Sequence, residues 1–462
     1  MILSIGHLAF LIVIILLFIL FLVIIYCYIN YTINIKKGDK NFKPIPKDNS
    51  AEYLNKLFDL IKIKTTSFET DANYHIFREK IKEMFPLVHR YFIKEKLEGN
   101  VLLRYKDNIP NAPNILFASH IDYPEYNQNP RIENGELYGD GAFDAKSLLY
   151  VMLEAIEKVL QESFSFPCNI IVAITKDDDS TKQGVNGMVE FFLKKGYFFD
   201  LVIEEGSGVV DPEFFGLQSH YALIGIGVTG EVTIRFKVPK SGAVRLTGFI
   251  HILRKKNIFR SKISNKTAPL LKQIAKDMKP LRRMTVSNLW LFRGKVKKIV
   301  DREFSQIAKM LKTELALGTV IETDNSYYID VVFQLSAHEE AADIIYSLGS
   351  YLDRYDIEYQ IIDIKDSTRI TSVKNQGYKV VKSAIEAVFG SIIVVPIIIT
   401  NTSEKRNYDK VSDCVIRFSP LYYSNSSYCD AKENKCEHVS ADSLAYAINF
   451  FEFIIKNYPG RK

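Results

Sequence analysis

The sequence predicts an α/β protein with a mostly parallel sheet and helices on both faces, interrupted by a smaller α+β unit and preceded by one membrane-spanning helix. Three observations predict this architecture. Buried-strand patterns alternate with helical patterns, period-two strands appear in the middle of the chain, and an uncharged apolar run opens it. With 462 residues, 47% of them hydrophobic and 25% charged, the chain can form about two or three folded units.

The charge balance and the cysteine count exclude several classes of protein. Sixty basic side chains against 54 acidic ones leave a formal charge of +6. A nucleic-acid-binding protein concentrates far more basic charge, so we expect no nucleic-acid partner. Five cysteines, none in a C-x-x-C pair, are too few for a disulfide scaffold.

The apolar run at residues 8–28 contains no charged side chain. A helix of about 21 residues crosses the roughly 30 Å hydrocarbon core of a bilayer. A cleaved signal peptide is the alternative. The absence of Lys or Arg before the run, its length and the lack of a small-x-small cleavage site favour an uncleaved anchor. We therefore expect a single-pass protein that contacts the lipid bilayer through this helix.

The flanking charges do not decide on which side of the membrane the folded part of the chain lies. Lysines lie on the C-terminal side of the run, and the positive-inside bias would place that side in the cytoplasm. Residues 29–50, rich in Lys, Pro, Asn and Asp, are predicted to form a tether.

Helical and buried-strand patterns alternate from residue 51 onward. The 3.6-residue period predicts helices at the start of this region and at residues 75–85, where Pro86 ends the second helix. Further helices are predicted at 147–160 and 185–195, and strands at 101–105, 114–119, 169–175 and 201–205. Crossovers of this length indicate a parallel sheet with helices on both faces.

The pattern changes near residue 225. Residues 230–238 and 327–336 alternate with period two, which is typical of half-exposed antiparallel strands. A basic helical stretch is predicted at 253–279, then a helix at 338–355 and a strand at 357–364. This β-α-β-β-α-β-like block predicts an inserted unit at 226–365. Residues 51–225 and 366–462, which end in a helix at 441–458, then form one domain.

Polar residues follow four successive predicted strands. His120 and Asp122 follow the first, Asp144 the second and residues 177–179 the third, and Glu204 lies at the end of the fourth. The carboxyl ends of strands in an α/β sheet are where function collects. An imidazole with several carboxylates suits a divalent cation, above all zinc. Each motif alone is a common turn, and only their recurrence favours a site.

The segments HID, YGDGAFDAK, the acidic cluster, EEG and SHYALIGIGVTG occur in an order that resembles a family of di-zinc metallopeptidases. The family includes carboxypeptidase S, aminoacylase, acetylornithine deacetylase and succinyl-diaminopimelate desuccinylase. The resemblance covers residues 51–458 and is strongest to the membrane-anchored or secreted carboxypeptidase S branch. It implies a zinc-peptidase-like α/β domain interrupted by an α+β ferredoxin-like lid through which a homodimer can form. Relatives in that branch are lumenal or extracellular, which disagrees with the cytoplasmic location that the flanking lysines indicate.

The resemblance also implies a role for each matched position. The positions that would bind zinc, as two ions, are His120, Asp144, Asp179, Glu204 and Glu433. Asp122 would orient His120, and Asp178 would be the general base. Arg406 would hold the substrate carboxylate with its guanidinium fork. The implied activity is a membrane-anchored zinc amidohydrolase or carboxypeptidase that cleaves a peptide or an N-acyl amino acid next to a free carboxylate.

Several positions depart from the family pattern. Asp178 replaces a longer Glu, and a gapless register would instead place Asp179-Ser180-Thr181 on the family triplet. Glu433 stands where the family has His, with His438 as an alternative ligand, and the lid segment PKSGAVRL lacks the family's His.

Two further hypotheses follow from these departures and from the charge pattern. The first is that the chain is a catalytically degenerate relative that keeps the fold and binds a ligand or metal. The second is that it is a membrane-tethered interaction protein whose basic segments RKKNIFRSK and MKPLRR contact acidic surfaces.

Overall fold

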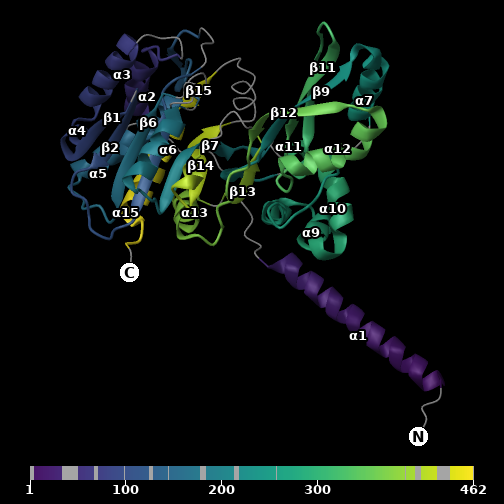
Figure 1. Ribbon diagram of the computed structural model, residues 1–462. Coiled ribbons are helices and arrows are strands. Elements are labelled where there is room, and N and C mark those ends of the chain that lie inside the picture. Colours follow the sequence, from purple (N-terminus) through teal and green to yellow (C-terminus); the bar gives the residue numbers. More distant parts are fainter. Residues whose placement is uncertain are drawn as a thin grey trace.

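The computed structural model describes residues 5–460 apart from 34–49, 67–70, 98, 124–127, 144, 177–183, 213–217, 256–257, 391, 401–406 and 424–436. Figure 1 shows a large sheet with its helices, a smaller sheet beside it, and one long helix that extends away from both.

The large sheet has eight strands in the order β1-β2-β6-β3-β7-β14-β8-β13. Its centre, β6-β3-β7-β14, is parallel throughout, whereas β1 and β2 pair antiparallel at one edge. The strands are β1 (Phe92–Leu97), β2 (Asn100–Tyr105), β6 (Asn169–Thr175), β3 (Asn114–His120), β7 (Leu201–Val210), β14 (Val415–Tyr423), β8 (Tyr221–Val228) and β13 (Ile393–Ile399).

Helices cover both faces of this sheet, as the sequence predicts. The larger core lies between the sheet and the helices α2 (Ser50–Ile61), α3 (Asp71–Met84), α4 (Pro86–Tyr91), α5 (Ala145–Gln161), α13 (Gln376–Phe389) and α15 (Ala441–Asn457). On the opposite face α6 (Gly184–Lys195) buries Met188 and Phe192 against Leu116 and Val202. Burying such side chains contributes about 1.5–3 kcal/mol each. The predicted α/β class is confirmed.

A small three-stranded sheet lies beside the large one, in the order β15 (His438–Ser440), β5 (Glu136–Tyr138) and β4 (Arg131–Glu133). All its pairings are antiparallel. It joins the segment before α5 to the segment before α15, which are about 300 residues apart in the chain.

The inserted unit contains a four-stranded antiparallel sheet in the order β10-β11-β9-β12. Its strands are β9 (Glu231–Pro239), β10 (Glu314–Glu322), β11 (Ser326–Gln334) and β12 (Glu358–Lys365), and its helices are α7 (Ala243–Lys255) and α12 (Ala341–Tyr355). With β9-α7-β10-β11-α12-β12 along the chain, this is the predicted ferredoxin-like arrangement. The boundaries at 226 and 365 stay a prediction.

Four helices that the sequence pattern does not resolve lie between α7 and β10: α8 (Ala268–Ile274), α9 (Pro280–Ser287), α10 (Leu289–Glu303) and α11 (Ser305–Leu311). The predicted helix at 253–279 is wrong, because α7 ends at Lys255 and α8 begins only at Ala268, with a proline in its first turn. These helices share a hydrophobic core with β8 and β13, to which Leu271, Val286, Val296, Tyr221 and Val395 all belong.

The N-terminal helix α1 (Ile5–Thr32) covers the apolar run at residues 8–28. Its segment Phe10–Thr32 has a mean hydropathy of 3.6 and is only 6% buried, so it is not a core helix. Among the described residues it is the one helix long and apolar enough to cross a membrane. Figure 1 shows its C-terminal end reaching α9 and α10.

Candidate functional site

His120 ends β3 at the carboxyl edge of the parallel strands, and acidic groups flank both of its ring nitrogens. Its Nε2 lies 2.5 Å from Oε2 of Glu205 on β7. On the other side, Nδ1 lies 2.8 Å from the main-chain oxygen of Asp122 and 3.5 Å from that residue's carboxylate. Asp122 is therefore placed to fix the ring orientation, chiefly through its carbonyl, and Nε2 faces Glu205.

The loop after β5 is held by a carboxylate from the far end of the chain. Glu437, which is buried, accepts hydrogen bonds from the Gly141 N–H at 2.7 Å and the Phe143 N–H at 3.4 Å. Gly141 has φ +82°, a conformation that side chains other than glycine's rarely adopt. Asp144 follows this loop directly in the sequence, so Glu437 anchors the segment that leads into that position.

Glu204, a predicted zinc ligand, forms an ion pair in the structure. Its Oε1 lies 2.9 Å from Nε of Arg417, and both side chains are 1% exposed. The two residues are register partners on β7 and β14. The strands send Glu204 to the same face as Val202, which packs in the α6 core. The adjacent Glu205, and not Glu204, contacts His120.

Lys146 lies fully buried beside the same loop. Its Nζ donates to the main-chain oxygens of Ile63 at 2.5 Å and Leu60 at 3.3 Å. Burial lowers the pKa of Lys146 to about 7, although the carboxylates of Asp140 and Glu437 act in the opposite direction. This side chain ties α5 to the end of α2.

His438, the alternative ligand, lies in the three-stranded sheet. Its ring stacks on that of Tyr138 with centroids 5.1 Å apart, and its Nε2 is 4.0 Å from the Glu136 carboxylate. Both of these contacts are with residues of the neighbouring strand β5.

Five predicted site residues lie outside the described residues: Asp144, Asp178, Asp179, Arg406 and Glu433. Within the described part of the chain, no group of three or more His, Cys, Asp or Glu side chains could hold a metal ion. The donors that do converge, His120 Nε2 and a Glu205 oxygen, are of the kinds that zinc accepts. The described residues thus fit part of a metal site, and the three predicted acidic ligands outside them would have to complete it.

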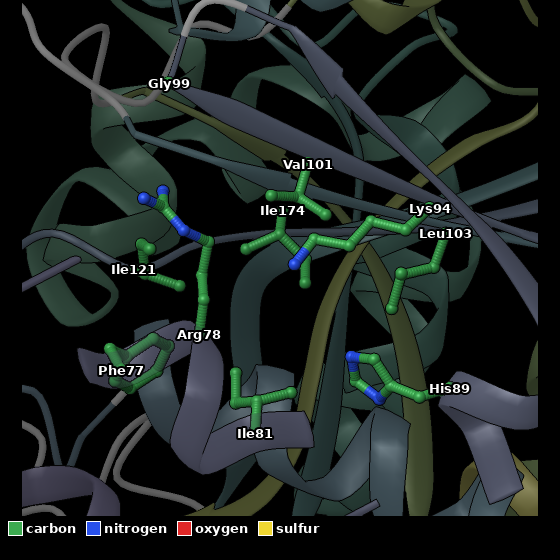
Figure 2. A pocket seen from close by; sticks show the side chains of 10 residues that line it. All are labelled: Phe77, Arg78, Ile81, His89, Lys94, Gly99, Val101, Leu103, Ile121 and Ile174. Atoms are coloured by element: carbon green, nitrogen blue, oxygen red, sulfur yellow. The ribbon is translucent and has the colours of Figure 1, made fainter. Parts of the chain in front are cut away.

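A separate pocket lies between α3, α4 and the outer strands β1 and β2 (Figure 2). Most of the residues that line it are apolar, and three basic residues also line it: Arg78, His89 and Lys94. Burial lowers the pKa of both His89 and Lys94. None of its lining residues is acidic, so it is not a metal site.

Comparison with known proteins identifies the family. A profile described as Peptidase family M20/M25/M40 matches residues 116–457. The chain belongs to this peptidase family. The predicted family is therefore confirmed.

Similar M20 proteins carry the names of hydrolases. The N-fatty-acyl-amino acid synthase/hydrolase PM20D1 of Bos taurus is 22% identical, with 82% of this chain and 81% of that protein covered. The probable carboxypeptidase S-like 2 of Dictyostelium discoideum is 24% identical over 88% of this chain and 85% of its own length.

Two solved structures share the M20 fold. The metallo-carboxypeptidase Sso-CP2 of Sulfolobus solfataricus has a TM-score of 0.59 and 17% identity, covering 88% of this chain and 99% of its own. Human carnosine dipeptidase 1 has a TM-score of 0.60 and 13% identity, covering 88% and 96%.

Three residues at the site were not singled out by sequence reasoning: Glu205, Arg417 and Lys146. Strand alternation is the signal that could have separated Glu205 from Glu204, because neighbouring side chains on a strand point to opposite faces. Arg417 could not have been found in this way, since its pairing depends on the register between β14 and β7.

The Glu204–Arg417 pair predicts a stability effect that does not depend on metal. In the chain stripped of metal by a chelator, Glu204→Gln should lower the free energy of unfolding by about 3–5 kcal/mol, because it leaves a buried guanidinium without that carboxylate. Urea titration of the detergent-solubilised full chain measures this change. The double variant Glu204→Met, Arg417→Met should be less destabilised than Glu204→Gln. If Glu204 acts only as a ligand, the metal-free Glu204→Gln chain will instead be as stable as the parent.

Proposed function

We propose that this protein is a membrane-anchored, zinc-dependent amidohydrolase or carboxypeptidase that cleaves a peptide or an N-acyl amino acid next to a free carboxylate. The observation that carries the proposal is the contact of His120 with the buried Glu205 at the carboxyl edge of the sheet, in a chain of the M20 family. The names of the similar proteins, carboxypeptidase S-like and N-fatty-acyl-amino acid hydrolase, support these substrate classes.

Zinc would be held by His120 and by Glu205, which takes the place predicted for Glu204, together with the predicted ligands Asp144, Asp179 and Glu433. When bound, it supplies a water whose pKa falls to about 7. The other steps, which are ligand orientation, proton transfer and substrate binding, fall to side chains of the protein. Asp122 keeps the imidazole in place, Asp178 takes the proton from the attacking water and returns it to the leaving amine, and Arg406 holds the substrate carboxylate.

The anchor is the N-terminal helix α1. A cleaved signal sequence passes the same test of length and composition. Favouring the anchor, the end of α1 is held by the folded part of the chain: Asn30 Nδ2 donates to Asn288 Oδ1 at 3.0 Å. A segment removed during maturation has no need of such contacts.

One observation favours the second candidate, a catalytically degenerate family member. Arg417 neutralises Glu204, the residue at the family's ligand position, in a fully buried pair. A carboxylate engaged in this way is a poorer metal ligand. If the remaining donors do not compensate, the chain keeps the fold and binds ligands without hydrolysing them.

We also propose a homodimer formed through the lid. The edge strand β12 exposes Tyr359, Ile361, Ile362 and Ile364, each between 41% and 47% accessible. An exposed apolar edge strand is a template for pairing with a second chain. Pairing of two β12 strands would cover these side chains.

Activity and metal content test the main proposal together. The purified full chain should bind about two zinc ions and hydrolyse members of a panel of dipeptides and N-acyl amino acids. A chelator should abolish turnover and zinc should restore it. Asp144→Ala should lose both zinc and turnover, whereas Asp107→Ala, which removes an exposed carboxylate, should lose neither. Zinc binding without turnover would favour the degenerate relative, and a chain that binds no zinc would contradict the zinc hydrolase.

Glu437 provides a test of the loop before Asp144. Glu437→Ala frees the Gly141 and Phe143 amides, so we expect zinc affinity or activity to fall by about 10–100-fold. Competition with a chromogenic chelator measures the affinity. The control, Glu136→Ala, removes a carboxylate from β5, which pairs with the strand that follows Glu437, and should have little effect. Unchanged zinc affinity and activity in Glu437→Ala would show that loop position does not matter.

The lid dimer is tested by Ile361→Lys with Ile364→Lys. Two charges on the exposed edge strand should convert a dimer into a monomer, because they block pairing of β12. Sedimentation of the detergent-solubilised chain, corrected for bound detergent, measures the mass. A parent chain that sediments as a monomer would refute the dimer.

A further inference from the structure

The end of the membrane helix is docked on α9 and α10 through several specific contacts. The fully buried Asn288 lies between these two helices, and its Nδ2 donates to the main-chain oxygen of Cys27 at 3.1 Å. Tyr26 packs edge-on against Trp290, with ring centroids 5.6 Å apart. The Arg283 guanidinium lies 4.9 Å from the ring centre of Tyr31.

These contacts fix the depth of α9 and α10 relative to a bilayer. The uncharged apolar run at residues 8–28 has 21 residues and is about 32 Å long as a helix at 1.5 Å per residue. The hydrocarbon core is about 30 Å thick, so the end of this run, where Tyr26 lies, reaches the boundary with the headgroup layer. Trp290 packs against Tyr26 and therefore lies at the same level.

The surface at this level has the composition of a membrane-contacting surface. Leu281, Trp290 and Leu291 are 76%, 52% and 47% exposed. Residues 279–300 contain seven basic side chains and no acidic one. Exposed apolar side chains surrounded by basic ones are typical of proteins that bind an anionic lipid surface.

We propose that α9 and α10 form a bilayer-contact surface, with Leu281, Trp290 and Leu291 in the headgroup layer and Arg293, Lys295 and Lys298 against anionic phospholipid headgroups. The opposite stripe of α10, with Val296 and Val300, packs in the core shared with β8 and β13. The surface therefore sets the orientation of the large sheet on the membrane. This inference rests on the proposed anchor and is independent of hydrolysis.

Trp290 is the single tryptophan of the chain, so its fluorescence reports on this surface alone. We would reconstitute the full chain in nanodiscs of phosphatidylcholine and phosphatidylserine in equal amounts. We expect a blue-shifted emission that is strongly quenched by bromine near the headgroup end of the acyl chains and less by bromine at the chain ends. The matched control carries Trp290→Phe with Tyr346→Trp, at a 90% exposed position on the lid helix α12, and should not be quenched.

The charges are tested by placing the bromine on one lipid class at a time. The parent should be quenched more by brominated phosphatidylserine than by brominated phosphatidylcholine, since each basic side chain contributes up to about fivefold to anionic-lipid binding. The triple variant Arg293→Glu, Lys295→Glu, Lys298→Glu should lose this preference. The control Arg254→Glu, Lys255→Glu, Arg354→Glu, on the lid helices, should keep it.

Two results would overturn the inference, and they are distinguishable. If Trp290 is unquenched while the chain resists alkaline extraction from membranes, the anchor holds and the contact surface is wrong. If alkaline extraction releases the chain, both the anchor and the surface are wrong, whatever the hydrolysis assay gives.

Discussion

The contact between His120 and Glu205 depends on the register between β3 and β7 in the parallel sheet. Ile115 and Phe117 pair with Leu201 and Ile203, so the strand carrying His120 and the strand carrying the glutamates run side by side in fixed register. Parallel strands present their carboxyl ends at one edge, and here the result is a 2.5 Å approach of imidazole and carboxylate. A shift of one residue in β7 would exchange the surroundings of Glu204 and Glu205.

The same constraint explains why two adjacent glutamates have different chemistry. Glu204 faces the α6 side of the sheet, where Arg417 from β14 neutralises it in a water-excluded environment. Glu205 points to the other face of the strand and contacts His120. A buried ion pair of this kind contributes little net stability but strongly disfavours removal of either partner. The sheet therefore pairs one carboxylate with Arg417 and places the other beside His120.

Sequence patterns predicted the elements whose signal is local. Periodicity located β3, β6, β7, α5, α6 and α15, and turn residues with strand ends located His120. What the patterns could not supply depends on distant pairings: the β14–β7 register that selects Arg417, and the Glu437 carboxylate that holds the loop at Gly141. The helices α9 and α10 were missed for a similar reason. Their buried stripe matches β8 and β13, and that match is not visible along the chain.

The helices α9 and α10 also bear on how the proposed anchor would orient the enzyme at a membrane. A flexible tether alone lets a domain sample many positions above a bilayer. Here Asn288 fixes α1 to α9 and α10. The turn that precedes α9 is fixed to β8 and the residues before it, because Asp277 accepts hydrogen bonds from the Ser219 N–H at 2.7 Å and from the Tyr221 hydroxyl at 2.8 Å. The chain of contacts from α1 to the large sheet is therefore continuous. With α1 as the proposed anchor, the orientation of the carboxyl edge at the membrane would follow from this packing.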